Sequence, residues 1–394
     1  MKHFVIVADT FPPLRTSGAI QLQDLTLEFV KQGYEITVLI PDSNIEFMWN
    51  IDKWNGVNIV RLKSFKTKDI GYIRRTVSEF LMSFIMLYNL RKSPIMDSQW
   101  DGVIWYSPTI FFGPLVKAIK KSSSCKSYLI LRDIFPEWAV DIGLMSKGIP
   151  YYFFKYIERN QYKFADTIGV QSPANLNYMY QYKSKDQYTE VLHNWLENVE
   201  NVGCSISISD STLVDRKVFV YAGNMGVAQG IDVLIKLAES LIDRKDIGFA
   251  FVGRGSDSKH LKERCNILKL DNVAFFDEIP HNEIPGLYAQ CHVGLIALDT
   301  RHRTHNIPGK FLSYMQNGLP VLASINPGND LIDIINSNDI GEVNINLSIT
   351  DLRIKAEKII DGLDNDLFIK GRCHKLMKTL FRPRIAVNQI AKSL

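Results

Sequence analysis

Short apolar runs alternate along this chain with longer amphipathic segments. The first run, residues 4–8, ends at Asp9, and residues 18–32 then carry apolar side chains at the spacing of one helix face. Gly33, a residue type that commonly ends helices, precedes a second apolar run at residues 35–40. Strand and helix patterns in alternation are typical of βαβ units, whose strands lie parallel in one sheet. The pattern therefore predicts an α/β fold.

The same alternation occurs in two halves of the chain, separated by a more polar stretch. In the first half we expect further strands at residues 58–62, 102–106, 128–131, 167–171 and 191–192. The second half has strand patterns at residues 218–221, 249–252, 273–276, 294–297 and 321–323, a helix at 231–241, and a mainly helical end from 351 to 394. We predict two parallel-sheet domains, residues 1–196 and 216–375, joined by a serine-rich linker at 197–215.

Composition narrows the classes of protein that fit this pattern. The 394 residues suit two domains, and 46% hydrophobic residues exclude a disordered chain. A net charge of +4 is too small to indicate nucleic-acid binding. The five scattered cysteines form no CxxC pair, so they indicate neither a structural zinc site nor a disulfide framework. The chain opens without a signal-peptide pattern and contains no apolar run of about 18 residues, so we expect a cytoplasmic protein.

Three glycines follow the first strand of the second half and precede its helix. They are Gly223, Gly226 and Gly230. Glycine allows a ligand to approach the backbone closely, and the N–H groups at a helix start attract anions such as phosphate. The spacing differs from GxGxxG, so no nicotinamide-binding fingerprint is present. An ordinary glycine-rich turn is the alternative interpretation.

A basic loop follows the strand at residues 294–297. It contains Arg301, His302, Arg303 and His305, and it leads to Lys310. Lys310 stands at a predicted helix start, where the macrodipole disfavours a cation, so we expect a compensating anion. A diphosphate shared with the glycine turn is one interpretation, and a solvated basic loop is the other.

Two segments of the first half have a composition suited to an acceptor site. The first segment joins the first strand to its helix, and the second follows the strand at 128–131; their polar or small residues are Arg15, Ser17, Gly18, Arg132, Asp133 and Glu137. In open parallel sheets, ligands bind beyond the carboxyl ends of the strands. The alternative for Arg132 and Asp133 is pairing with neighbouring structure. Neither Asp133 nor Glu137 lies in a metal-ligand pattern.

Five motifs occur in a fixed order along the chain. They are Phe11-Pro12-Pro13 with Gly18, residues 131–137, residues 221–230, residues 251–255, and residues 307–321. Together they resemble retaining GT-B glycosyltransferases of family 4, in particular the bacterial branch that builds O-antigen and capsule repeat units. The resemblance covers nearly the whole chain. It implies two Rossmann-like domains facing a central cleft, with residues 376–394 crossing back to the first domain.

The resemblance also implies the roles of individual residues. In the second domain, the residues expected to bind a nucleotide sugar are Gly223, Asn224, Gly226, Gln229, Ile279, His305 and Ser313. The first domain would bind the acceptor through Arg15, Ser17, Gly18, Arg132 and Glu137. Catalytic roles fall to Lys310, Asp133 and Arg254, with Lys310 as the main counter-charge to the diphosphate. No metal ion or other cofactor is implied.

Several positions depart from the family pattern. His305 and Ser313 stand where the family usually has two glutamates, and a serine reaches less far toward a ribose. Asn224 and Gln229 replace the Arg and Lys common around the glycine turn, so diphosphate binding should depend more on Lys310, with Arg254 and Arg303 as candidates. Arg132-Asp133 occupies the place of a histidine common in the wider family.

The activity implied is retaining transfer of a sugar to a saccharide carried on undecaprenyl diphosphate. UDP is the expected nucleotide, and an N-acetylated amino sugar such as N-acetylfucosamine is the expected donor sugar. Such an acceptor would bring the enzyme to the inner face of the cytoplasmic membrane. Residues 72–92 suit a membrane surface because basic residues bracket their apolar positions, although an ordinary core helix has the same pattern. The alternative functions are a UDP-N-acetylglucosamine 2-epimerase-like enzyme and an inactive transferase-like scaffold.

Overall fold

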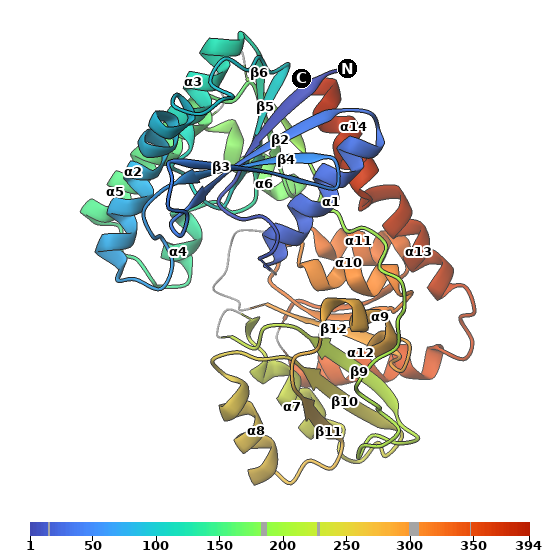
Figure 1. Cartoon of the computed structure of the whole chain (residues 1–394). Coiled ribbons are helices and arrows are strands. Elements are labelled where there is room, and N and C mark those ends of the chain that lie inside the picture. The colour runs from blue at the N-terminus through green and yellow to red at the C-terminus, as the bar shows by residue number, and fades with distance from the viewer. Residues whose placement is uncertain (15, 183–186, 227–228, 299–306, 347) are drawn as a thin grey trace. The chain divides into compact units, whose positions relative to one another are not determined.

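The computed structural model describes the chain except for residues 15, 183–186, 227–228, 299–306 and 347. The chain divides into two compact units, each with its own sheet and core. The first unit comprises Met1–Trp195 together with Arg382–Leu394, and the second comprises Leu196–Phe381 (Figure 1). Each unit is described by itself.

The first unit contains an eight-stranded sheet in the order β3-β4-β2-β1-β5-β6-β7-β8. Its strands are β1 (His3–Val7), β2 (Glu35–Asp42), β3 (Trp49–Trp54), β4 (Val57–Lys63), β5 (Gly102–Ser107), β6 (Lys126–Leu131), β7 (Thr167–Val170) and β8 (Tyr188–Val191). Its helices are α1 (Ser17–Lys31), α2 (Tyr72–Leu90), α3 (Gly113–Ser123), α4 (Glu137–Asp141), α5 (Ile149–Lys163), α6 (Pro173–Tyr180) and α14 (Pro383–Ser393). The predicted parallel sheet is confirmed.

Strand β1 shows why the first apolar run has no polar face. It lies inside the sheet between β2 and β5, and helices cover both sides. Val5 and Val7 face a core that includes Met82 and Met86 of α2. Phe4 and Ile6 face the opposite core, where α1 meets α14. A parallel strand that is buried on both faces reads as a continuous apolar run.

Strand β3 is an element that the apolar pattern does not predict. It pairs antiparallel with β4 at the edge of the sheet, and most of its side chains are exposed. Asn55 and Gly56 form the connecting turn with φ values of 47° and 84°. An Asn-Gly pair in this conformation is a strong hairpin signal, and it was the only local sign of this strand.

The second unit contains a six-stranded parallel sheet in the order β11-β10-β9-β12-β13-β14. Its strands are β9 (Lys217–Ala222), β10 (Ile247–Val252), β11 (Val273–Phe276), β12 (Val293–Ala297), β13 (Val321–Ser324) and β14 (Gly341–Asn344). Its helices are α7 (Asp232–Ser240), α8 (Ser258–Ile267), α9 (Ile284–Tyr288), α10 (Gly309–Gln316), α11 (Leu331–Asn338), α12 (Ile349–Gly362) and α13 (Ile369–Leu380), with a short 3-10 helix at His281–Glu283.

The polar stretch at residues 197–215 belongs to the second unit. Its Ile208 and Leu213 are buried in that unit's core. The Gln290 side chain accepts a hydrogen bond from the Ile208 N–H at 2.9 Å and donates one to the Ile206 carbonyl at 2.9 Å. The stretch expected to be a linker is thus a coil anchored to the second unit, because Ile208 and Leu213 are buried in its core and Cys204 and Ile206 pack against it.

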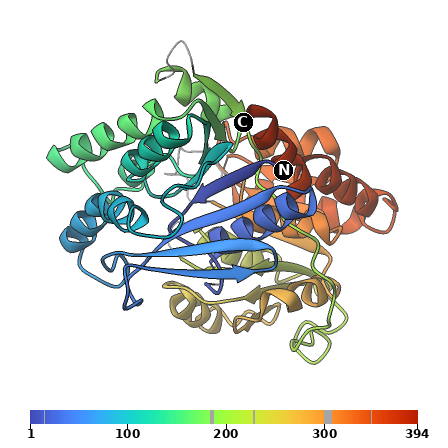
Figure 2. The ribbon, with the colours of Figure 1, turned by 45° about the horizontal axis from the view of Figure 1, so that its top comes forward.

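The C-terminal segment returns to the first unit at Arg382, later than the expected residue 376. Phe381 is still buried in the second unit, where its ring packs against Phe311. Val387 and Ile390 of α14 then join the core that contains Leu22 and Phe29 of α1. Both chain ends therefore lie in the first unit (Figure 2).

Candidate functional site

The carboxyl edge of the second sheet brings the glycine turn against the loop after β10. The Gly223 N–H donates to the Val252 carbonyl at 2.9 Å, and the Met225 N–H donates to the Arg254 carbonyl at 2.8 Å. A Cβ at Gly253 would lie 2.2 Å from the Gly223 oxygen, and one at Gly255 would lie 2.2 Å from the Met225 oxygen. Only glycine allows this packing, so the two glycine motifs of the sequence form one structure.

Lys310 lies beside this turn, at the first turn of α10. Its ammonium group lies 4.6 Å from the centroid of the Tyr221 ring, and a Cβ at Gly223 would lie 3.8 Å from its Cε atom. Burial lowers the pKa of Lys310 to about 8. Among the described residues, no carboxylate forms an ion pair with it. A partly buried cation that has no carboxylate partner in the described part of the chain suits an anionic ligand.

The backbone of the glycine turn offers further groups to an anion. In the described part of the chain, no acceptor binds the N–H groups of Asn224 and Gly226. The Tyr221 hydroxyl stabilises the turn by donating a hydrogen bond to the Asn224 carbonyl at 2.8 Å. The Gln229 N–H donates to the Gly226 carbonyl at 3.0 Å, so Gln229 uses its backbone to close the turn. Free N–H groups beside a cation are a typical phosphate-binding arrangement.

The other residues expected to bind the donor are placed differently. Arg254 is largely exposed, and its Nε lies 2.9 Å from Glu278 Oε2. Ile279 is partly buried and packs against the core of the second unit. Ser313 lies one helical turn after Lys310 in α10. His305 and Arg303 lie outside the described residues.

The carboxyl edge of the first sheet gathers a second polar group. Arg132, which follows β6, donates to the Asn194 side chain and lies with its guanidinium 5.7 Å from the Tyr106 ring. A Cβ at Gly18 would lie 3.3 Å from Tyr106 Cε1, which is tighter than most real Cβ contacts, so the start of α1 lies close against the Tyr106 ring. The charge of Asp133 acts on the Tyr106 hydroxyl, which places this carboxylate nearby. Gly18, Arg132 and Asp133 therefore lie in one cluster.

Ser17 and Arg15 border this cluster in the sequence. Ser17 is the first residue of α1, after the cap that Thr16 forms by accepting a hydrogen bond from the Ala19 N–H. Arg15 lies outside the described residues.

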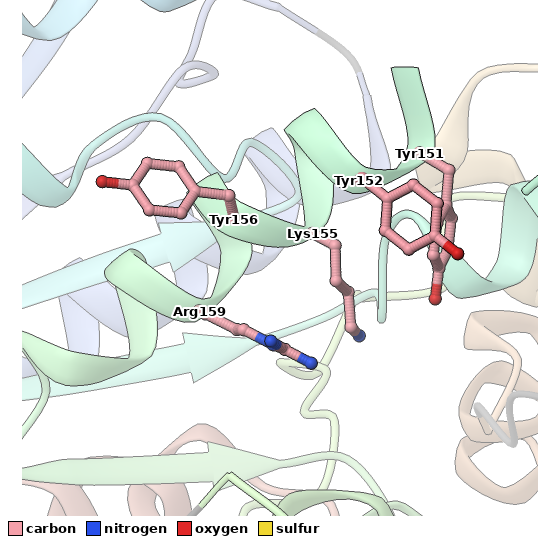
Figure 3. A pocket seen from close by; sticks show the side chains of 5 residues that line it. All are labelled: Tyr151, Tyr152, Lys155, Tyr156 and Arg159. Carbon is pink, nitrogen blue, oxygen red and sulfur yellow. The ribbon is translucent and has the colours of Figure 1, made fainter. Parts of the chain in front are cut away.

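Glu137 instead belongs to a buried ionic network at the start of α4. Its Oε1 lies 2.5 Å from Lys155 Nζ, and the Tyr151 hydroxyl donates to its Oε2 at 3.1 Å. Lys155 also contacts Glu158 Oε2 at 2.6 Å. Figure 3 shows Tyr151 and Lys155 on α5, at a hollow also lined by Tyr152, Tyr156 and Arg159. Glu137 thus has structural partners of its own.

Asp9 is a residue that the sequence analysis did not single out as a site residue. It follows β1, and its Oδ1 is buried without a hydrogen-bond partner. Burial raises the pKa of Asp9, while Lys68 and Arg75 lower it and Glu79 raises it. Its charge also acts on Tyr106, so it belongs to the Arg132 cluster. The only signal in the sequence is a carboxylate directly after an apolar strand.

The described residues contain no group of three His, Cys, Asp or Glu side chains able to hold a metal ion. No helix in the described part of the chain has both the length and the apolar content needed to cross a bilayer.

Two Rossmann-like units in one chain define the GT-B fold, and solved structures share it. A sucrose-phosphate synthase from Thermosynechococcus elongatus matches 100% of this chain and 98% of its own with a TM-score of 0.75 and 13% identity. Anabaena Alr3699/HepE, solved with UDP and glucose, matches 99% of this chain and 98% of its own at TM-score 0.68 and 14% identity. WaaG, a glycosyltransferase involved in lipopolysaccharide biosynthesis, matches 98% of this chain and 99% of its own at TM-score 0.67 and 14% identity. At these identities the likeness establishes the fold.

Sequence comparisons add a family for the second unit. Residues 216–361 match the family described as glycosyl transferases group 1. The chain is 24% identical over 218 residues, 51% of its length and 52% of the relative's, to Escherichia coli K12 WcaI, named as a colanic acid biosynthesis glycosyl transferase. It is 27% identical over 229 residues, 55% of each chain, to Pseudomonas aeruginosa WbjE, named as a glycosyltransferase. The chain therefore spans about half the length of the curated relatives it matches.

Proposed function

We propose that this protein is a retaining glycosyltransferase that moves a sugar from a nucleotide diphosphate donor to a lipid-linked saccharide in cell-surface polysaccharide synthesis. The observation that carries the proposal is Lys310, a partly buried cation beside a glycine turn in which the N–H groups of Asn224 and Gly226 have no acceptor among the described residues. The family match of residues 216–361 covers both features. A diphosphate would supply the missing anion.

In the proposed reaction, the bond between the sugar's anomeric carbon and the diphosphate oxygen breaks. The acceptor oxygen bonds to that carbon on the same face, and its proton leaves with the diphosphate. Negative charge grows on the leaving group, so Lys310 and the turn's N–H groups would stabilise the transition state more than the ground state. The protein supplies position and charge, and no covalent nucleophile is required.

The finer assignments follow from the relatives and the first unit. UDP is proposed as the nucleotide because Alr3699/HepE was solved with it. The names of WcaI and WaaG, which refer to colanic acid and lipopolysaccharide, favour a cell-surface saccharide as the product. The cluster of Asp9, Arg132 and Asp133 would bind the acceptor. The donor sugar is proposed to be N-acetylated, and no metal ion is assigned a role. The proposed location is the inner face of the cytoplasmic membrane.

The test is a panel of UDP- and GDP-sugars incubated with the full chain and a bacterial membrane lipid extract. Mass spectrometry should detect a lipid-linked saccharide heavier by one sugar. Lys310→Met should lose this product, whereas Lys236→Met, an exposed lysine on α7, should retain it. Conversion of the donor without any acceptor would point to an epimerase, and calorimetry showing no nucleotide binding would point to a scaffold; either result contradicts the proposal.

A further inference from the structure

Helix α2 carries apolar side chains on two opposite faces. Met82, Met86 and Leu90 are buried in the first unit's core. On the other face, Ile73 is 83% exposed, Val77 is 53% exposed and Phe84 is 48% exposed. The solvent face of a helix in a globular protein is normally polar. Core packing therefore explains one face of α2, whereas Ile73, Val77 and Phe84 on the other face remain exposed.

Helix α5 extends this exposed surface. Its Ile149, Phe153 and Tyr156 recur at the spacing of one helix face and are all exposed. The Phe153 ring centroid lies 6.0 Å from that of Phe80 on α2, and Phe80 lies 6.0 Å from Phe84. The exposed residues of the two helices thus form one continuous patch, the α2–α5 face: Ile73, Val77, Phe80, Phe84, Phe153 and Tyr156. Contiguous apolar patches of this kind mark interaction sites.

The charge around the α2–α5 face is strongly positive. Residues 66–92 contain six Lys and Arg against two acidic residues, and residues 147–163 contain four against one. Both acidic residues on the helices themselves are already paired: Glu79 with Arg75 at 2.8 Å, and Glu158 with Lys155 at 2.6 Å. The cations that stay exposed, such as Arg74, Lys92 and Arg159, have no described carboxylate partner. The face therefore presents apolar side chains surrounded by unpaired positive charge.

The hollow on α5 adds a place for a headgroup. Its volume is about 210 Å³, and Tyr152, Tyr156 and Arg159 line it (Figure 3). Lys155, which also lines it, is neutralised by two carboxylates, whereas Arg159 lies over the Tyr182 ring at 5.6 Å. Arg159 is thus the available cation in a hollow walled by tyrosines, which suits a phosphate group at a lipid interface.

We propose that the α2–α5 face docks on an anionic phospholipid bilayer. Aromatic and aliphatic side chains enter the interface between headgroups and acyl chains, while the surrounding cations bind anionic headgroups. Stable binding to a bilayer needs both apolar insertion and electrostatic attraction, and this face combines the two. The inference deepens the proposed function, on which it rests for the role of docking, by naming the surface through which a lipid-linked acceptor is reached.

The test is flotation of the full chain with vesicles, without donor or acceptor. The protein should float with phosphatidylglycerol–phosphatidylcholine vesicles, should bind phosphatidylcholine alone much less, and should be released by salt. The double variant Ile73→Ser/Phe84→Ser should bind at least about tenfold more weakly. Arg74→Gln/Lys92→Gln should lose the preference for phosphatidylglycerol. Leu367→Ser/Phe368→Ser removes two apolar residues of the second unit that are at least as exposed as Phe84, and this variant should bind like the wild type.

Two outcomes would overturn the inference. One is vesicle binding that is absent, or equal in the wild type and both α2 variants. The other is self-association, seen by analytical ultracentrifugation, that the Ile73→Ser/Phe84→Ser variant abolishes while vesicles fail to bind; the face would then dock on a second copy. Because lipid binding is measured without sugar transfer, failure here leaves the proposed function standing. Loss of transfer in the donor panel would likewise leave the vesicle result unchanged.

Discussion

Burial opposes the charged forms of two ionisable side chains, Asp9 just after β1 and Lys310 in the first turn of α10. Burial lowers the pKa of Lys310 to about 8 and raises the pKa of Asp9. Neither side chain has an ion pair among the described residues. Groups kept at such a cost to stability are concentrated at functional sites. Replacing either residue should therefore change the free energy of unfolding and its pH dependence, in addition to any effect on activity.

Replacing Lys310 with methionine should stabilise the protein while weakening UDP binding. At pH 7 the folded state must hold a buried ammonium group, so its removal should raise the free energy of unfolding by up to roughly 3 kcal/mol. In the wild type this group loses its proton near pH 8 when folded but near its usual, higher pKa when unfolded. Wild-type stability therefore gains with rising pH above about 8, and the advantage of the variant should shrink there.

Urea unfolding at pH 7 and at higher pH, with calorimetry of UDP binding, measures both effects of the Lys310 substitution. Lys236→Met serves as the matched control, because that lysine is exposed on α7 and should change neither quantity. A destabilised Lys310→Met that still binds UDP normally would contradict the assigned role.

Asp9→Asn should behave as the acidic counterpart in the first unit. With its pKa raised by burial, Asp9 costs stability once it ionises, so the amide should raise thermal stability at pH 7. The gain should fade as the pH drops toward the range where the wild-type carboxyl is protonated in both states. Sugar transfer should fall by at least about tenfold with UDP affinity unchanged, because the residue belongs to the acceptor-side cluster. Asp97→Asn, at an exposed carboxylate of the same unit, is the control; equal transfer rates in both variants would exclude Asp9 from the site.

At the scale of elements, the Lys155 network joins three helices of the first unit. Lys155 on α5 contacts Glu137 at the start of α4, Glu158 on α5 and the Tyr178 hydroxyl on α6. Burial alone would lower the pKa of Lys155, but the two carboxylates outweigh it and raise the pKa above its ordinary range. The helices beside the proposed lipid-binding face are thus fixed by charge as well as by packing.

Lys155→Met should destabilise the first unit by about 3–5 kcal/mol, because it leaves the buried Glu158 and the partly buried Glu137 without their cation. The double variant Lys155→Met/Glu158→Gln should recover part of this loss, since one of the two orphaned charges is gone. Urea unfolding of the full chain measures both values. A double variant no more stable than the single one would show that the network does not depend on charge pairing.

At the scale of the whole molecule, the proposed donor site lies entirely within the second unit. UDP added to the full chain should slow amide hydrogen exchange at residues 223–226, 253–255 and 309–313, and should leave the strand ends of the first unit unchanged. The reason is that the buried lysine and the glycine loops both lie in the second unit. Hydrogen-exchange mass spectrometry with and without UDP measures this. Protection confined to residues 9–18 and 132–137 would place the nucleotide in the first unit and would contradict the proposed donor site.

The sequence by itself determined most of the sheet strands and the glycine and lysine motifs of the second unit. Buried parallel strands can be recognised in the sequence because both of their faces must be apolar. The glycine loops can be recognised because their close packing requires glycine. The sequence did not determine β3, whose side chains are mostly exposed, or the packing of residues 197–215, where only the structure shows that Ile208 and Leu213 are buried in the second unit's core.

Only the tertiary structure decided which polar residues meet and which surfaces remain open. It brought the charges of Asp9 and Arg132 to bear on the same Tyr106 hydroxyl, gave Glu137 a buried lysine as partner, and left one apolar face of α2 exposed next to α5. Periodicity along a helix reports that a face is apolar, but it carries no information on what covers that face. Contacts between residues far apart in the chain depend on strand order and helix packing, which a local pattern does not encode.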